Sequence, residues 1–193
     1  MMRLDEHCPG FFLRTTEGEY GFDPTQHAFR LLVFLSTPFS AADTTDILAI
    51  DACSDFYEKN NVTVVLISRS SIHVNLGWID AIHKIYGREI TIMIGEDPTS
   101  EVFKAFGVEN AKAAVVVDKQ GQCRWHISLD RRLTFDIKEI KRALLALIEV
   151  NQSSCKTPEG WVPGGRTIKD NPLNRKAILR NRNWFYDLSP EKA

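Results

Sequence analysis

Residues 31–67 read LLVFLSTPFSAADTTDILAIDACSDFYEKNNVTVVLI, and this stretch decides the fold. It opens on the apolar run Leu31–Leu35 and closes on the β-branched run Val62–Ile67, each typical of a buried strand. Between them, residues 44–58 have apolar side chains at helical spacing, which predicts one helix with an apolar face. Those side chains are Ile47, Ile50, Cys53, Phe56 and Tyr57. Strand, helix and strand in this order predict an α/β fold.

Further strands are predicted on the C-terminal side of this unit. Ile90–Ile94 and Ala113–Val117 are also continuous apolar runs, so all four runs should form the centre of one sheet. Asp118-Lys119-Gln120-Gly121 supplies turn residues before residues 122–127, whose alternating pattern predicts an antiparallel partner nearer an edge. The sheet should therefore be mixed, with an antiparallel pair beside its parallel strands.

Helical patterns separate and follow these strands. Residues 71–85 and 98–106 are helix candidates, and residues 136–150 give the clearest pattern, with apolar positions on one face. We expect residues 1–150 to form one domain and residues 151–193, rich in Ser, Pro, Gly and Asn, to form a tail or arm. The basic run of that tail is a solvated helical face or a docking arm for a partner. Its members are Arg175, Lys176, Arg180 and Arg182, around Ile178-Leu179 and before Trp184-Phe185.

Composition excludes several classes of function. The 193 residues are 44% apolar and 25% charged with a formal net charge of -1, which gives no electrostatic reason to expect nucleic acid as a partner. No apolar stretch approaches the roughly 20 residues of a membrane span. Met1–His7 contains two acidic residues and no apolar signal region, so the expected location is the cytoplasm.

The four cysteines, Cys8, Cys53, Cys123 and Cys155, show neither CxxC nor zinc-ligand spacing, so reduced thiols are expected. Cys53 falls on the apolar side of its helix and Cys123 in a strand, which favours packed, unreactive positions for both. His73 and His83 have no acidic partner at ligand spacing, and no GxSxG elbow is present. We expect no metal and no cofactor.

Residues 34–49, FLSTPFSAADTTDILA, resemble the active-site segment of peroxiredoxins, which reads approximately F-Y-P-x-D-F-T-F-V-C-P-T-E-I-x-A. Further similar blocks follow in order: Ser68-Arg69-Ser70-Ser71 with Trp78, Phe106-Gly107-Val108, residues 113–121, and residues 155–164 against C-P-x-x-W-x-P-G with two residues inserted. The resemblance spans Cys8 to about Lys169. It implies a thioredoxin-like fold and the typical two-cysteine subclass.

The same resemblance implies that the family's chemistry is lost. In peroxiredoxins a low-pKa thiolate in the first helical turn attacks the peroxide, and here Asp43 stands at that position. A carboxylate is a weak nucleophile and has no sulfenic acid state. Ser40 stands for the family's Thr, Ser36 for its Pro, and Lys112 for the Arg that holds the peroxide; Cys155 matches the resolving cysteine. Lys lacks the rigid fork with which Arg binds two oxygens.

Two interpretations of Asp43 remain open. It is an ordinary acidic residue of a first helical turn, worth about 0.3–1 kcal/mol through the helix dipole. Alternatively, paired with Lys112, it imitates the negatively charged hyperoxidised cysteine and holds the helix in its folded form. Cys155, in turn, is an inherited tail residue or pairs with Cys8, Cys53 or a partner protein.

We therefore expect a peroxiredoxin-like protein without thiol peroxidase activity, acting as a structural or interaction protein. A homodimer or a family-type ring is expected, with contacts through the tail and the sheet edge, and without nucleic acid or membrane as partners. The alternative is a thiol-dependent peroxidase that uses Cys155 or Cys123, or a redox sensor.

Overall fold

The computed structural model describes residues 2–26, 28–153, 155–169 and 175. The chain divides into two compact units, Met1–Ile137 and Lys138–Ala193, which are described separately. In the described ranges no helix combines the length and the apolar character needed to cross a membrane.

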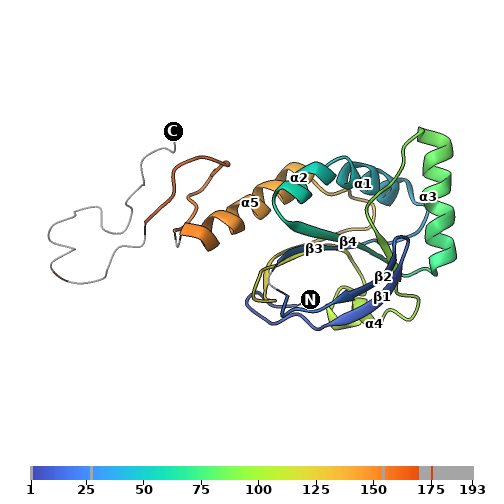
Figure 1. Ribbon diagram of the computed structural model, residues 1–193, viewed down its shortest axis with the longest axis horizontal. Helices are drawn as coiled ribbons and strands as arrows, with labels where there is room; N and C mark the ends of the chain where they lie inside the picture. The colour runs from blue at the N-terminus through green and yellow to red at the C-terminus, as the bar shows by residue number, and fades with distance from the viewer. Residues whose placement is uncertain (1, 27, 154, 170–174, 176–193) are drawn as a thin grey trace. The chain divides into compact units, whose positions relative to one another are not determined.

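A mixed sheet of seven strands dominates the first unit, in the order β2-β1-β5-β4-β3-β6-β7 (Figure 1). The strands are β1 Phe11–Thr15, β2 Gly18–Phe22, β3 Phe29–Phe34, β4 Val62–Ser68, β5 Ile94–Glu96, β6 Lys112–Val117 and β7 Cys123–Leu129. β3 is parallel to β4, β4 is parallel to β5, and β6 runs antiparallel to both β3 and β7. The predicted strands thus hold the centre, and the predicted antiparallel hairpin reaches the edge.

Both faces of the central strands are buried. Leu32 and Phe34 belong to an apolar cluster that includes Phe103 and Phe106 from α4 (Glu101–Ala105) and its C-terminal end. Successive strand residues face opposite sides, and Leu31 and Val33 are also fully buried, so the second face is covered as well. Figure 1 shows α1 and α2 on one side of the sheet and α4 on the other.

The single helix predicted over residues 44–58 is wrong, because the chain forms two helices there. They are α1, Ala41–Asp51, and α2, Ser54–Lys59. The Ser54 hydroxyl donates to the Asp51 carbonyl at 2.6 Å, taking an acceptor that a continuing helix would use. The break leaves Cys53 half-buried at the start of α2, which corrects the expectation of a core position.

The strand predicted at Ile90–Ile94 is displaced toward the C-terminus, because β5 begins at Ile94. The Asp51 carboxylate accepts from the backbone N–H groups of Thr91 and Ile92, at 2.8 and 3.2 Å, and so occupies donors that a sheet ladder would need. The β1–β2 hairpin was missed, although Gly18, at φ 109, permits its tight turn. Helices α3 (Ile72–Tyr86), α4 and α5 (Ile137–Ser153) confirm the other helical predictions.

The second unit contains most of α5 and the segment that follows it. Lys156 and Ile168 form an antiparallel bridge, with reciprocal backbone hydrogen bonds of 2.8 and 2.7 Å, around the buried Trp161. The division of the chain at residue 150 stays a prediction. The predicted basic run and Trp184-Phe185 lie outside the described residues, except for Arg175, which is exposed.

Candidate functional site

The candidate site begins where β3 leaves the sheet and the chain turns into α1. Ser40 caps the helix with extended backbone angles, and its hydroxyl accepts from the Asp43 N–H at 3.1 Å. A Ser followed by an acid at this spacing usually forms a reciprocal capping box. Asp43 instead turns its carboxylate away from Ser40, toward the loop before the helix.

The Asp43 carboxylate is fully buried, and both of its oxygens have partners. Oδ2 accepts from the Ser36 N–H at 3.0 Å, the Ser36 hydroxyl at 2.8 Å and the Thr37 N–H at 2.7 Å. Oδ1 lies 2.9 Å from the Lys112 ammonium. Asp43 is therefore much more than a surface acid beside a helix dipole, because it is held by the loop, the helix and the sheet together.

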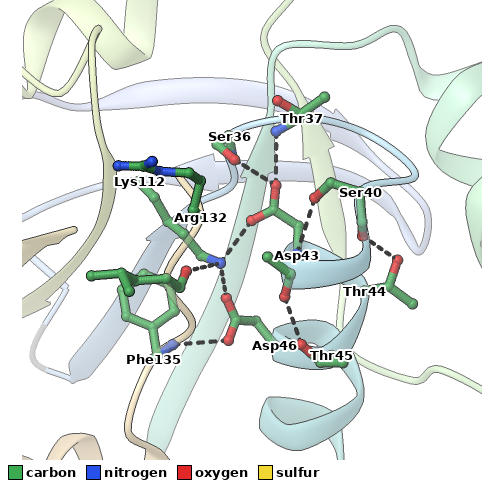
Figure 2. Close-up of polar contacts among 12 residues, drawn as sticks. Ser36, Thr37, Ser40, Asp43, Thr44, Thr45, Asp46, Lys112, Arg132 and Phe135 are labelled. Atoms are coloured by element: carbon green, nitrogen blue, oxygen red, sulfur yellow. Dashed lines mark hydrogen bonds and ion pairs between the residues drawn. The ribbon is translucent and has the colours of Figure 1, made fainter. Parts of the chain in front are cut away.

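Lys112, the first residue of β6, is a fully buried lysine whose ammonium lies between two carboxylates (Figure 2). Its nitrogen pairs with Asp43 and Asp46 and donates to the Leu133 carbonyl at 3.0 Å. It also lies 5.2 Å from the centre of the Phe135 ring. Three oxygens therefore lie around the ammonium, two of them carboxylate oxygens in ion pairs and the third the hydrogen-bonded Leu133 carbonyl.

Asp46 is the third member of this cluster and lies one helical turn after Asp43. One of its oxygens pairs with Lys112, and the other accepts from the Phe135 N–H at 2.9 Å. Burial raises the pKa of Asp46, against the lowering effects of Lys112 and of the Phe135 N–H, and the Asp43 charge raises it further. Two carboxylates thus share one ammonium, and the second carboxyl has a tendency to bind a proton.

The structure brings together three of the residues selected from the sequence, Ser40, Asp43 and Lys112. Asp46, Thr37 and Phe135 were missed as site residues. The i, i+3 spacing of Asp43 and Asp46 on one helix was an available signal for the first of them. Ser36 has a clear role here, because a proline at that position would offer neither the N–H nor the hydroxyl that Asp43 accepts.

None of the contacts that the structure gives Asp43 involves a thiol. Cys8 and Cys123 are buried in the first unit, and burial raises the pKa of their thiols to about 12 and about 11. Cys155 belongs to the second unit, where its sulfur lies 2.8 Å from the Ser153 hydroxyl oxygen. Cys53 and Cys155 are half-buried.

The cluster is also buried, because the side chains of Asp43, Asp46 and Lys112 are at most 2% exposed. A hollow of about 250 Å³ lies beside the start of α1, between Phe39, Thr44 and Trp78, but Asp43 does not line it. Thr44 lines the hollow, and its hydroxyl accepts from the Trp78 indole N–H at 3.0 Å. Among the described residues no group of three His, Cys, Asp or Glu side chains could hold a metal ion.

No family model matches the sequence. Curated relatives do: a peroxiredoxin of Aquifex aeolicus is 28% identical over 96% of this chain and 87% of its own length. Peroxiredoxin 2 of Picrophilus torridus is 23% identical over 94% of this chain and 96% of its own length. Among solved structures, a yeast mitochondrial 1-Cys peroxiredoxin superposes with a TM-score of 0.83 at 19% identity, covering 93% of this chain and 92% of the other.

These similarities extend over nearly the whole chain and agree with the mixed seven-stranded sheet and its flanking helices. The chain is therefore similar to peroxiredoxins over nearly its whole length and has a thioredoxin-like α/β fold.

Proposed function

We propose that this peroxiredoxin-like protein has no thiol peroxidase activity and acts as a structural or interaction protein. The observation that carries the proposal is the fully buried Asp43 carboxylate, paired with Lys112 at the start of the helix where the resemblance places the peroxide-attacking cysteine. A carboxylate has no sulfenic acid state and cannot enter the disulfide that completes thiol peroxidase turnover.

The groups around Asp43 support the same conclusion, because each already has a partner within the protein. The Ser40 hydroxyl accepts the helix-capping hydrogen bond, and the Lys112 ammonium has three acceptors. The Lys112 ammonium, which stands where the resemblance places the peroxide-holding Arg, is thus already engaged by two carboxylates and a carbonyl. A peroxide would also have to displace an ion pair that water does not reach, which is costly in a buried site.

The remaining thiols are poor replacements for the missing nucleophile. Cys8 and Cys123 are buried with raised pKa values, so very little thiolate forms at neutral pH. An enzyme or redox sensor would therefore have to use Cys53 or Cys155, which are half-buried.

Peroxide consumption by the full chain with a thiol reductant tests the proposal. Wild type should consume peroxide no faster than a variant in which all four cysteines are serine. Activity lost in Cys155→Ser and retained in the matched Cys53→Ser variant would establish Cys155 as a nucleophile and refute the proposal. Intact mass after low peroxide would reveal a sensor, because a sulfenic acid adds oxygen without turnover.

As an interaction protein, the chain should form a homodimer or a ring through its tail and the edge of its sheet. β2 and β7 are the outer strands of the described sheet, and an outer strand offers backbone groups to a pairing chain. Size-exclusion chromatography with light scattering should give at least a dimer. A monomer at every concentration would refute the assembly, while leaving the loss of peroxidase chemistry to its own assay.

A further inference from the structure

Lys112 and Asp43 form a fully buried ion pair, with Nζ 2.9 Å from Oδ1, so that an amine and a carboxyl group are held in contact away from water. We propose that these two side chains join in an intramolecular isopeptide bond, formed by the protein itself with loss of one water. The bond would link the start of β6 to the first turn of α1. It is independent of the proposed loss of peroxidase activity.

The nucleophile is the Lys112 amine, which must first lose a proton. Lys112 and Asp43 are both fully buried, and the Phe135 ring lies beside the nitrogen. Proton transfer from the ammonium to Asp43 Oδ1, along their existing contact, gives a neutral amine facing a neutral carboxylic acid. The neutral amine is the nucleophilic form of a lysine side chain.

The electrophile is the Asp43 carboxyl carbon, and its second oxygen already occupies an oxyanion hole. When the amine attacks, electrons from the C=O bond move onto Oδ2. That oxygen accepts the N–H groups of Ser36 and Thr37 and the Ser36 hydroxyl, at 2.7 to 3.0 Å. Donors fixed in advance around the oxygen that gains negative charge are the most effective means of stabilising an acyl-transfer intermediate.

Asp46 moves the second proton. It contacts the Lys112 nitrogen, and its other oxygen is fixed by the Phe135 N–H. Its carboxylate takes a proton from the attacking nitrogen and passes it to the Oδ1 hydroxyl, which leaves as water when the C=O bond re-forms. Of the three protons on the ammonium, two depart in the water and one remains on the amide nitrogen. Asp46 ends as it began, and the raised pKa of its carboxyl suits this exchange.

The geometry assigns Asp43 rather than Asp46 as the acyl partner, although both contact the amine. Two backbone N–H groups and a hydroxyl converge on one oxygen of Asp43, whereas a single backbone N–H holds Asp46. Asp43 therefore has the better oxyanion hole.

Intact mass of the denatured full chain tests the bond directly. Wild type should be lighter than its sequence mass by one water, and peptide mapping should yield a branched peptide containing Asp43 and Lys112. Lys112→Arg keeps the positive charge but cannot form the amide, and it should have the full mass. This variant also excludes cyclisation of an aspartate onto its own backbone, which loses water without a lysine. Wild type at full mass would overturn the proposal.

Two further variants assign the roles within the cluster. Asp43→Asn should lose ammonia instead of water if residue 43 is the acyl group, while continued loss of water would transfer that role to Asp46. Asp46→Ala should remain at full mass while keeping the wild-type circular dichroism spectrum. A folded Asp46→Ala protein that still forms the bond at the wild-type rate would refute the proton-transfer role. The wild-type mass decides the proposal even if a variant fails to fold.

Discussion

Replacing Lys112 by methionine should destabilise the protein strongly at neutral pH. The change removes the ammonium that Asp43 and Asp46 share and leaves a side chain of similar length in its place. Breaking a buried ion pair by removing one partner costs about 3–5 kcal/mol. Asp43 keeps three hydrogen-bond donors of its own, so Asp46 is the carboxyl that should respond by binding a proton.

Protonation of Asp46 limits how much free energy of unfolding the Lys112→Met variant can lose. Keeping an aspartate protonated at pH 7, about 3 units above its ordinary pKa near 3.9, costs roughly 4 kcal/mol at 1.36 kcal/mol per unit. At pH 5 the same protonation costs about 1.5 kcal/mol. The destabilisation by Lys112→Met should therefore shrink by more than half on acidification from pH 7 to pH 5.

Urea denaturation followed by circular dichroism measures this loss. With a slope of about 2 kcal/mol/M, a 4 kcal/mol loss lowers the midpoint by about 2 M at an unchanged slope. Lys112→Arg keeps a positive charge but cannot form the amide bond, and it serves as a second variant for comparison. Lys84→Met removes an exposed lysine paired with Asp80 and should cost under about 1 kcal/mol. A Lys112→Met loss as small as that, or one equal at both pH values, would refute the reasoning.

Three other predictions concern Ser36, Asp46 and the four cysteines. Ser36→Pro removes two donors to Asp43 and should cost at least about 2 kcal/mol in urea denaturation, against about 1 for Ser36→Ala; equal costs would mean that the backbone donor is unimportant. The folded state binds a proton at Asp46 more readily than the unfolded chain does, so this stabilising contribution is present in acid and lost as pH rises through the raised pKa. Asp46→Asn removes this contribution, and the stability of wild type minus that of the variant should fall as pH rises from about 4; a flat difference contradicts the assignment. Cys53 and Cys155 should react with a thiol reagent before Cys8 and Cys123, which should react only on unfolding; early modification of Cys123 would contradict its burial.

The centre of the sheet could be predicted because β3, β4 and β6 are continuous apolar runs, buried on both faces. The break between α1 and α2 could not, because it depends on where the Ser54 hydroxyl finds an acceptor. The start of β5 depends in the same way on Asp51, which holds Thr91 and Ile92 across a long sequence separation. The Asp51 contacts are tertiary and the Ser54 contact is a side-chain to backbone bond, and apolar periodicity encodes neither.

The candidate site, too, was predictable in part from the sequence. The register of the resemblance brought Asp43 and Lys112 to one place, and the structure pairs them. The direction of the Asp43 carboxylate was not predictable, because the capping-box spacing from Ser40 favours a carboxylate that points back toward Ser40. Asp46 was overlooked because an acid in a helix usually faces water, and its burial follows from the Lys112 ammonium being within reach.

Positions 36, 43 and 112, which the sequence resemblance predicts to differ from the peroxiredoxin pattern, form a single bonded unit in the structure. A carboxylate at 43 needs a cation and several donors to be buried, and Lys112 and Ser36 supply them. A proline at 36 would withdraw two of those donors. An arginine at 112 would have to fit a planar fork where a point charge now meets three acceptors. The three positions are therefore energetically coupled, and a double-mutant cycle between 36 and 112 should give an interaction free energy well above the roughly 0.5 kcal/mol seen for independent sites.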